Sequence, residues 1–315
     1  MARIAVVASN FSNNPILRKE LLAIHPDARF HDAYTLLSGD ALIDFIGDAD
    51  TVISALEPFD ATIFEACPNL KLISKFGVGV NMLNFDDLVR YGVRVGWTGG
   101  VNKRSVSELA LGYMLSALRN LPLSDRNMRK GDTWNRILGQ ELTGKTVGII
   151  GCGHIGKDLV DILKPFRCRV LVNDILDFPE FYAKNNIEAV PLQTLLCEAD
   201  IVSIHTPINE STYHLIGVDE LALMKDTAVL INTARGGIID EAALKDALKA
   251  NQIGYAGIDP FEVEPAQDAE LLNLPNVIST PHLGATTQQG NLAMGRAAIA
   301  GLSDNRLPDA EWPTR

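Results

Sequence analysis

The chain has 315 residues, 47% of them hydrophobic, and a formal net charge of −11 at pH 7. This length predicts two domains, because a single hydrophobic core stops growing at about 250 to 300 residues. The acidic balance disfavours nucleic acid and anionic membranes as partners. No apolar run reaches the roughly 18 residues that a membrane-spanning helix requires.

The ends and the cysteines point to an ordinary cytoplasmic protein. The first residues lead directly into a strand-like run and lack the basic and apolar regions of a signal peptide, so we expect a cytoplasmic location. Cys67, Cys152, Cys168 and Cys197 show no paired C-x-x-C spacing. We therefore expect buried thiols and predict neither a disulfide framework nor a metal site.

Apolar strand-like runs alternate with helix-like segments along almost the whole chain. The runs are residues 4–8, 51–54, 72–75, 93–96, 146–150, 170–172, 201–205, 229–232, 255–258 and 277–279. This alternation predicts an α/β fold with two Rossmann-like or flavodoxin-like domains, each built on a parallel sheet with helices on both faces. Such sheets bind ligands at the carboxyl ends of their strands, so we expect a cleft between the domains.

Two helices define the expected domain boundaries. Apolar residues from Val106 to Leu118 recur at helical spacing, which predicts a long helix that links the domains and is capped by Ser105 and Glu108. A second helix is expected over 288–302, returning to the first domain. The prediction is a discontinuous substrate domain, 1–98 with 287–315, and a nucleotide domain, 99–286.

A glycine-rich loop follows the run at 146–150 and precedes a helix-like segment. Its residues are Gly151, Cys152, Gly153, His154, Ile155 and Gly156. In this strand-to-helix context the glycines allow a tight turn, and the helix N-terminus offers N–H groups to a pyrophosphate. Asp174 ends the next strand 18 residues later and suits the ribose diol of NAD, whereas it would repel the 2′-phosphate of NADP. Taken alone, without the glycine loop, Asp174 would be better interpreted as the start of a turn.

Three residues of different chemistry follow later strands: Arg235, Glu264 and His282. A planar guanidinium binds a carboxylate through two hydrogen bonds, an imidazole exchanges a proton near neutral pH, and a carboxylate orients the imidazole. Together they predict oxidation of a 2-hydroxy acid. Each residue alone could be a surface turn residue or a solvated loop residue.

Two further segments carry candidate ligand contacts. His205 ends a strand-like run at the same sheet edge and is a candidate cofactor contact, although a packing histidine fits nearly as well. Lys75, Gly77, Val78 and Gly79 stand at another strand end, where successive backbone N–H groups can bind the substrate carboxylate. A simple glycine turn is the competing interpretation.

The motifs GCGHIG, HTP at 205–207, NTARGG, DPFEVEP and PHLGAT, together with KFGVGVN, resemble those of the D-isomer-specific 2-hydroxyacid dehydrogenases over nearly the full length. The 3-phosphoglycerate dehydrogenase branch is the most similar, in a short form without a regulatory domain. The resemblance implies that Arg235 binds substrate, that His282 transfers the proton and that Glu264 tunes His282. The cofactor contacts that it implies are Val78, Gly151, Gly153, His154, Ile155, Gly156, Asp174, His205, Thr206, Pro207, Thr233, Ala234, Asp259, Leu283, Gly284 and Ala285.

The resemblance also implies a homodimer formed through the nucleotide domain. It leaves the 2-hydroxy or 2-keto acid open: 3-phosphoglycerate, glycerate or a larger acid. The segment from Ser54 to Pro58 supplies no arginine for a phosphate, with Lys75 and Arg104 as substitutes. Two alternatives are an NAD-sensing protein similar to a transcriptional corepressor and a dehydrogenase of another small anion such as phosphite.

Overall fold

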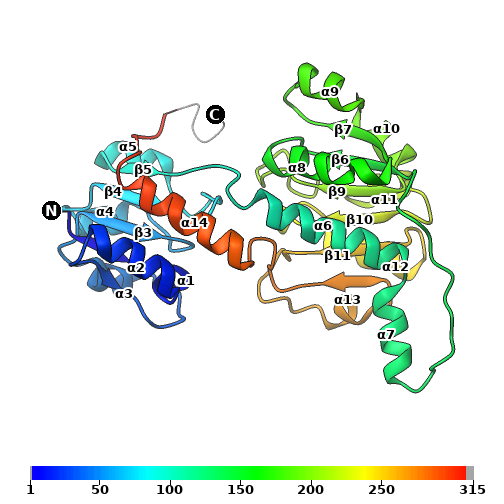
Figure 1. The fold of residues 1–315 in the computed structure, drawn as a ribbon, viewed down its shortest axis with the longest axis horizontal. Coiled ribbons are helices and arrows are strands. Elements are labelled where there is room, and N and C mark those ends of the chain that lie inside the picture. Colours follow the sequence, from blue (N-terminus) through cyan, green and yellow to red (C-terminus); the bar gives the residue numbers. More distant parts are fainter. Residues whose placement is uncertain (1, 310–315) are drawn as a thin grey trace. The chain divides into compact units, whose positions relative to one another are not determined.

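The computed structural model describes residues 2–309. These residues form two compact units (Figure 1). One unit holds the residues up to Asn102 together with those from Thr287 onward, and the other holds Lys103–Thr286. The first boundary thus falls after Asn102 instead of after residue 98.

The first unit is built on a five-stranded parallel sheet. Its strands are β1 Ile4–Val6, β2 Arg29–Phe30, β3 Thr51–Ser54, β4 Leu72–Lys75 and β5 Arg94–Gly96. Its helices are α1 Ser9–Ser12, α2 Pro15–Ile24, α3 Gly39–Ile46, α4 Ala61–Ala66, α5 Phe85–Tyr91 and α14 Gln288–Gly301. The strand order is β2-β1-β3-β4-β5, the flavodoxin-like order, and every residue of β3 and β4 is buried. These strands are therefore buried on both faces, as is usual in a parallel sheet.

The second unit is built on a seven-stranded parallel sheet. Its strands are β6 Thr146–Ile150, β7 Arg169–Asn173, β8 Ile187–Ala189, β9 Ile201–Ile204, β10 Val229–Asn232, β11 Tyr255–Ile258 and β12 Val277–Ser279. Its helices are α6 Lys103–Leu118, α7 Leu121–Arg129, α8 His154–Leu163, the short 3-10 helix Lys164–Phe166, α9 Pro179–Asn185, α10 Leu192–Glu198, α11 Val218–Leu223, α12 Glu241–Lys249 and α13 Ala269–Asn273.

The order β12-β11-β10-β9-β6-β7-β8 makes the second sheet a doubly wound Rossmann sheet. The chain reverses direction across the sheet between β6 and β9, which pair from Val147 with Ile201 to Ile150 with Ile204. One buried apolar cluster lies on each face of this sheet, and a third lies in the first unit. The predicted α/β class with two parallel sheets is confirmed.

Sequence patterns missed two edge strands and misplaced one helix start. β2 has two residues and β8 has three, and their side chains are largely exposed, so neither produces an apolar run. Helix α6 begins at Lys103, which places Ser105 inside the helix instead of at its cap. Within the described residues, no helix combines the length and the apolar character needed to cross a membrane.

Helix α14 closes the first unit by packing against β4 and β5. The Ser74 hydroxyl donates to the carbonyl of Ala298 at 2.6 Å. Gly96 and Gly301 meet backbone to backbone, because a Cβ built on Gly96 would lie 2.3 Å from the Gly301 carbonyl oxygen. The glycines therefore set the distance between the helix and the sheet.

We predict that Gly96→Ala destabilises the first unit by about 1 to 3 kcal/mol, because backbone must move to admit the methyl group. Chemical denaturation followed by circular dichroism measures the change. Gly112→Ala is the matched control: Gly112 is exposed in α6, and a Cβ there meets nothing within 4 Å. It should be neutral or slightly stabilising, since alanine favours a helix over glycine. Equal effects of the two substitutions would contradict the packing role of Gly96.

Candidate active site

The glycine loop joins β6 to α8 at the point where the second sheet reverses. Gly151 has φ +92°, and a Cβ there would lie 2.8 Å from the backbone of His205. A Cβ on Gly156 would lie 2.3 Å from the Gly151 carbonyl oxygen, so the loop closes tightly on the first turn of α8. Gly153, by contrast, faces open space and caps α8, which begins at His154. This leaves room for a pyrophosphate at the amides of the first helical turn.

Asp174 lies at the end of β7, beside the glycine loop. Its Oδ2 accepts a hydrogen bond from the backbone N–H of Cys152 at 2.5 Å, and its Oδ1 accepts one from Leu176 at 2.8 Å. A carboxylate offers about four acceptor positions, so lone pairs are left for a diol. The sequence predicted this placement from spacing alone.

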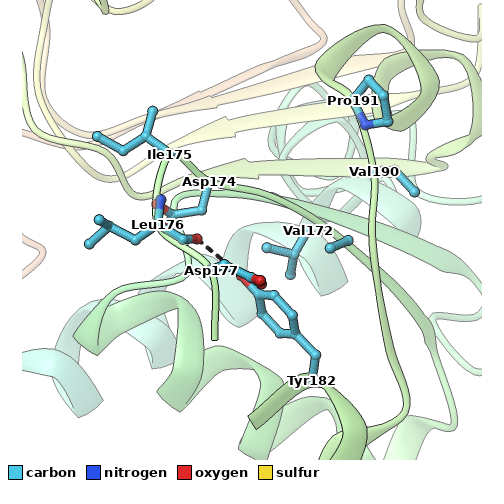
Figure 2. A pocket seen from close by; sticks show the side chains of 9 residues that line it. Val172, Asp174, Ile175, Leu176, Asp177, Tyr182, Val190 and Pro191 are labelled. Carbon is cyan, nitrogen blue, oxygen red and sulfur yellow. Dashed lines mark hydrogen bonds between the residues drawn. The ribbon is translucent and has the colours of Figure 1, made fainter. Parts of the chain in front are cut away.

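A pocket of about 350 Å³ opens next to Asp174 (Figure 2). Its lining consists of Val172, Asp174, Ile175, Leu176, Asp177, Tyr182, Ala189, Val190 and Pro191. Figure 2 shows the Tyr182 ring from α9 facing the segment from Asp174 to Asp177. A second carboxylate, Asp177, therefore shares the pocket, and the sequence analysis did not identify it. Apolar walls with carboxylates at one side suit an adenosine without a 2′-phosphate.

The carboxyl ends of β9 and β10 carry buried polar atoms without partners. They are Nδ1 of His205, Oγ1 of Thr206 and Oγ1 of Thr233, and none has a hydrogen-bond partner within residues 2–309. Burial lowers the pKa of His205 to about 3, so its imidazole is neutral. The other ring nitrogen, Nε2, lies 2.9 Å from the Ser203 hydroxyl. Unpaired buried groups are rare in proteins, and these fit a ligand that brings its own donors and acceptors.

Arg235 lies in the loop after β10, which the Asn232 side chain holds in shape. Asn232 is buried, donates to the Arg235 carbonyl at 2.8 Å and accepts from the Ala234 N–H at 3.0 Å. The Arg235 guanidinium is half-buried and donates to the Ala234 carbonyl at 2.7 Å. Burial lowers the pKa of Arg235, and the nearby charge of Glu264 opposes that shift. An arginine remains charged throughout the physiological range nevertheless.

Glu264 and His282 form a direct pair. Oε2 of Glu264 lies 2.9 Å from Nδ1 of His282, and both side chains are partly exposed. The backbone of His282 is left-handed, with φ +55°. Three sequence-predicted residues therefore come together in the second unit: Glu264 contacts His282 and acts electrostatically on Arg235.

Asp259, expected as a cofactor contact, supports the His282 loop in this structure. Its Oδ1 accepts from the Thr280 hydroxyl at 2.6 Å and from the Leu283 N–H at 2.5 Å, and its Oδ2 accepts from the Gly284 N–H at 2.8 Å. The Tyr113 hydroxyl forms a hydrogen bond with the Thr280 hydroxyl, and burial raises the pKa of this phenol. Sequence reasoning assigned neither Thr280 nor Tyr113 a role in the site.

The remaining candidates lie at the carboxyl end of β4 in the first unit. Gly77 has φ +119°, and the Val78 carbonyl accepts from Trp97 at 3.1 Å. Lys75 is buried: its ammonium donates to the Ala55 carbonyl and lies 3.1 Å from the Met82 sulfur. Burial lowers the pKa of Lys75 to about 8, against the opposing charge of Glu57. This lysine is therefore engaged within its own unit.

Comparison with known proteins agrees with this site. Residues 111–284 match the family model described as D-isomer specific 2-hydroxyacid dehydrogenase, NAD binding domain. The chain is 36% identical to a glyoxylate reductase of Korarchaeum cryptofilum, covering 84% of this chain and 82% of that protein. It is also 36% identical to a D-3-phosphoglycerate dehydrogenase of Methanocaldococcus jannaschii, over 89% of this chain but only 54% of that protein.

A solved structure of D-lactate dehydrogenase with NAD+ from Lactobacillus jensenii superimposes with a TM-score of 0.78 and 31% identity, covering 97% of this chain and 98% of that one. The chain belongs to the D-isomer-specific 2-hydroxyacid dehydrogenase family. It is an NAD-dependent oxidoreductase acting on CH–OH donors, which confirms the predicted family, enzyme class and cofactor.

We predict that Asp174→Asn lowers the preference for NADH over NADPH by about 10- to 100-fold, because a charge-assisted hydrogen bond contributes about 1.5 to 3 kcal/mol. Steady-state kcat/KM values with each cofactor measure the ratio. Glu180→Gln is the control, because it removes one negative charge from an exposed position in α9. It should leave the ratio unchanged. An unchanged ratio in the Asp174 variant would remove this residue from the cofactor site.

Proposed function

We propose that this protein catalyses reversible hydride transfer between C2 of a D-2-hydroxy acid and NAD, with Arg235, Glu264 and His282 as the catalytic residues. The single observation that carries this proposal is the 2.9 Å contact between Glu264 and Nδ1 of His282, beside the half-buried Arg235. It supplies a proton-exchanging group with an orienting carboxylate and a cation for an anionic substrate. These are the requirements of the reaction.

His282 exchanges the hydroxyl proton through Nε2, since Nδ1 is occupied by Glu264. During oxidation Nε2 accepts the proton as the C2 hydride leaves and the hydroxyl becomes a carbonyl. During reduction the protonated ring returns that proton to the carbonyl oxygen. The Glu264 charge stabilises the imidazolium in both directions.

Arg235 binds the substrate carboxylate through its fork of N–H donors and polarises the C2 carbonyl. Partial burial strengthens both effects, because less water competes for the donors. In the first unit, the backbone N–H groups of Gly77, Val78 and Gly79 are the proposed second site for the carboxylate. The buried Lys75 supports this loop instead of supplying an exposed charge.

The residues proposed to hold the cofactor fall into three groups. Gly151, Gly153, His154, Ile155 and Gly156 would hold the pyrophosphate, and Asp174 the adenosine ribose. His205, Thr206, Pro207, Thr233 and Ala234 would surround the nicotinamide side, with Val78, Asp259, Leu283, Gly284 and Ala285. NAD, when bound, supplies the hydride acceptor.

Among the candidate substrates, the structure favours an unphosphorylated acid of the size of glycerate or glycolate. Both cations considered for a phosphate are engaged: Lys75 by the Ala55 carbonyl, and Arg104 by Asp158, with Nε to Oδ2 at 3.1 Å. Two relatives, a glyoxylate reductase and a hydroxypyruvate reductase, are named for small unphosphorylated acids of this kind. The relatives named D-3-phosphoglycerate dehydrogenase supply the competing substrate.

The test is an NADH-oxidation screen with glyoxylate, hydroxypyruvate, 3-phosphohydroxypyruvate and longer 2-keto acids. We expect turnover with the unphosphorylated acids and a loss of at least about 100-fold in kcat/KM for Arg235→Ala. The kcat/KM of Arg235→Lys should lie between those of the wild type and Arg235→Ala, because lysine keeps the positive charge but lacks the forked N–H donors of the guanidinium. Absence of turnover with every acid, alongside tight NADH binding, would refute the proposal and favour an NAD sensor.

We also propose a homodimer through the second unit. Helix α7 has no buried residue and extends beyond the seven-stranded sheet, and the segment after it leads back to β6 (Figure 1). Four apolar side chains of this arm are exposed: Leu121, Met128, Trp134 and Leu138. Large apolar side chains left exposed along one arm are typical of an interaction surface.

Sedimentation velocity should therefore give twice the mass of one chain. Leu138→Asp, at a side chain that is 95% exposed, should shift the protein to a monomer because it places a charge in the interface. Ile175→Asp is the control, since Ile175 is equally exposed but lies by the adenosine pocket. A monomeric wild-type chain would overturn the assignment.

A further inference from the structure

We infer that Glu262 is a positioning residue that fixes the loop carrying Glu264 against the loop carrying Arg235. The inference rests on the proposed function, because its effect on catalysis passes through those two residues. Glu262 lies in the loop after β11, two residues before Glu264. It does not itself touch Arg235 or His282 through any hydrogen bond in the described residues.

The Glu262 carboxylate binds two side chains from the loop that follows β9. Oε1 accepts from the Tyr213 hydroxyl at 2.8 Å, and Oε2 lies 3.2 Å from Nε2 of His214. The Tyr213 and His214 rings stack with centroids 4.0 Å apart at 15°, so the two partners are also held against each other. The hydrogen bond to Glu262 raises the pKa of the Tyr213 phenol.

The Tyr213 segment is in turn joined to the loop after β10. The backbone N–H of His214 donates to the Gly237 carbonyl at 2.7 Å, and the N–H of Ile216 donates to the Ile238 carbonyl at 3.1 Å. On its other side, the backbone N–H of Glu262 donates to Glu241 in the first turn of α12 at 2.6 Å. Glu262 therefore connects the loops after β9 and β11 with the start of α12.

Gly236 brings the two catalytic loops into direct contact. A Cβ on Gly236 would lie 2.0 Å from the Phe261 carbonyl oxygen and 2.6 Å from Cα of Glu262. Gly236 immediately follows Arg235, so the backbone next to the proposed substrate cation rests on the backbone at Glu262. Displacing this contact moves Arg235 and Glu264 relative to each other.

The effect is expected in catalysis far more than in stability. The side chains of Glu262 and His214 are each 33% exposed, and ion pairs at such sites contribute little to folding. Catalysis is more sensitive, because small displacements of a catalytic group cost large factors in rate. A positioning role is therefore separable from a folding role.

The experiment compares Glu262→Ala with Glu210→Ala, an exposed glutamate in the loop after β9 that also carries Tyr213 and His214. For reduction of the best 2-keto acid, we expect Glu262→Ala to lower kcat about tenfold. Its KM for NADH and its Tm should stay close to those of Glu210→Ala. Hydrogen exchange of the 259–265 peptide should be faster in Glu262→Ala than in Glu210→Ala.

A double-mutant comparison identifies the route of the effect. Glu264→Gln should lower kcat by itself. In the Glu264→Gln background, Glu262→Ala should lower kcat further by much less than tenfold, because the contact it supports has already lost its charge.

Glu262→Ala and Glu210→Ala with equal kcat and equal hydrogen exchange would overturn the inference. A full tenfold further loss of kcat from Glu262→Ala in the Glu264→Gln background would also overturn it. If the wild-type chain reduces no 2-keto acid, the proposed function fails, and hydrogen exchange alone then decides the role of Glu262. Faster exchange of the 259–265 peptide supports the positioning role, and unchanged exchange refutes it.

Discussion

The hydrogen bonds accepted by Asp259 are the interaction on which the candidate site depends most. One buried carboxylate takes a hydroxyl and two backbone N–H groups from the loop of His282, and so fixes both sides of the left-handed residue at 282. A charge in this position would be costly without such partners. Because β11 and β12 are neighbours in the sheet, the acid at the end of one strand can hold the loop after the next.

The same geometry explains why an acidic protein can recognise an anion. The net charge of −11 acts over the whole surface, whereas Arg235 is partly withdrawn from solvent in a loop shaped by Asn232. His205, at the end of β9, is neutral, so it adds no positive charge to the site. At this sheet edge, the charge of the partly desolvated Arg235 therefore has more effect on an anion than the more distant negative charges of the surface.

Sequence patterns anticipated most of the fold and the chemical elements of the site. Continuous apolar runs such as 51–54 and 229–232 marked buried strands, and the glycine loop with Asp174 marked the cofactor side. The predicted proximity of Glu264 and His282 is present, while their catalytic roles stand as proposals. Short edge strands escaped because β2 and β8 expose their side chains.

Side-chain partners were the part that sequence could not supply. Lys75 appeared available to an anion, yet its ammonium faces the Ala55 carbonyl, because β3 and β4 pair with Ser54 opposite Lys75. Glu262 lies inside the DPFEVEP motif and Thr280 lies two residues before His282, yet their partners could not be predicted, because these contacts depend on which loops the strand order places side by side. Register and strand order decide such contacts, and both arise from long-range pairing.

The return of α14 to β4 and β5 has a consequence for how the chain is made on the ribosome. The first sheet lacks its covering helix until residue 301 has been synthesised, because Ser74 and Gly96 find their partners only there. The complete second unit, by contrast, lies between these two pieces and can fold as soon as it emerges. Strands β4 and β5 are therefore made early, yet they receive this helix only after the whole second unit has been synthesised.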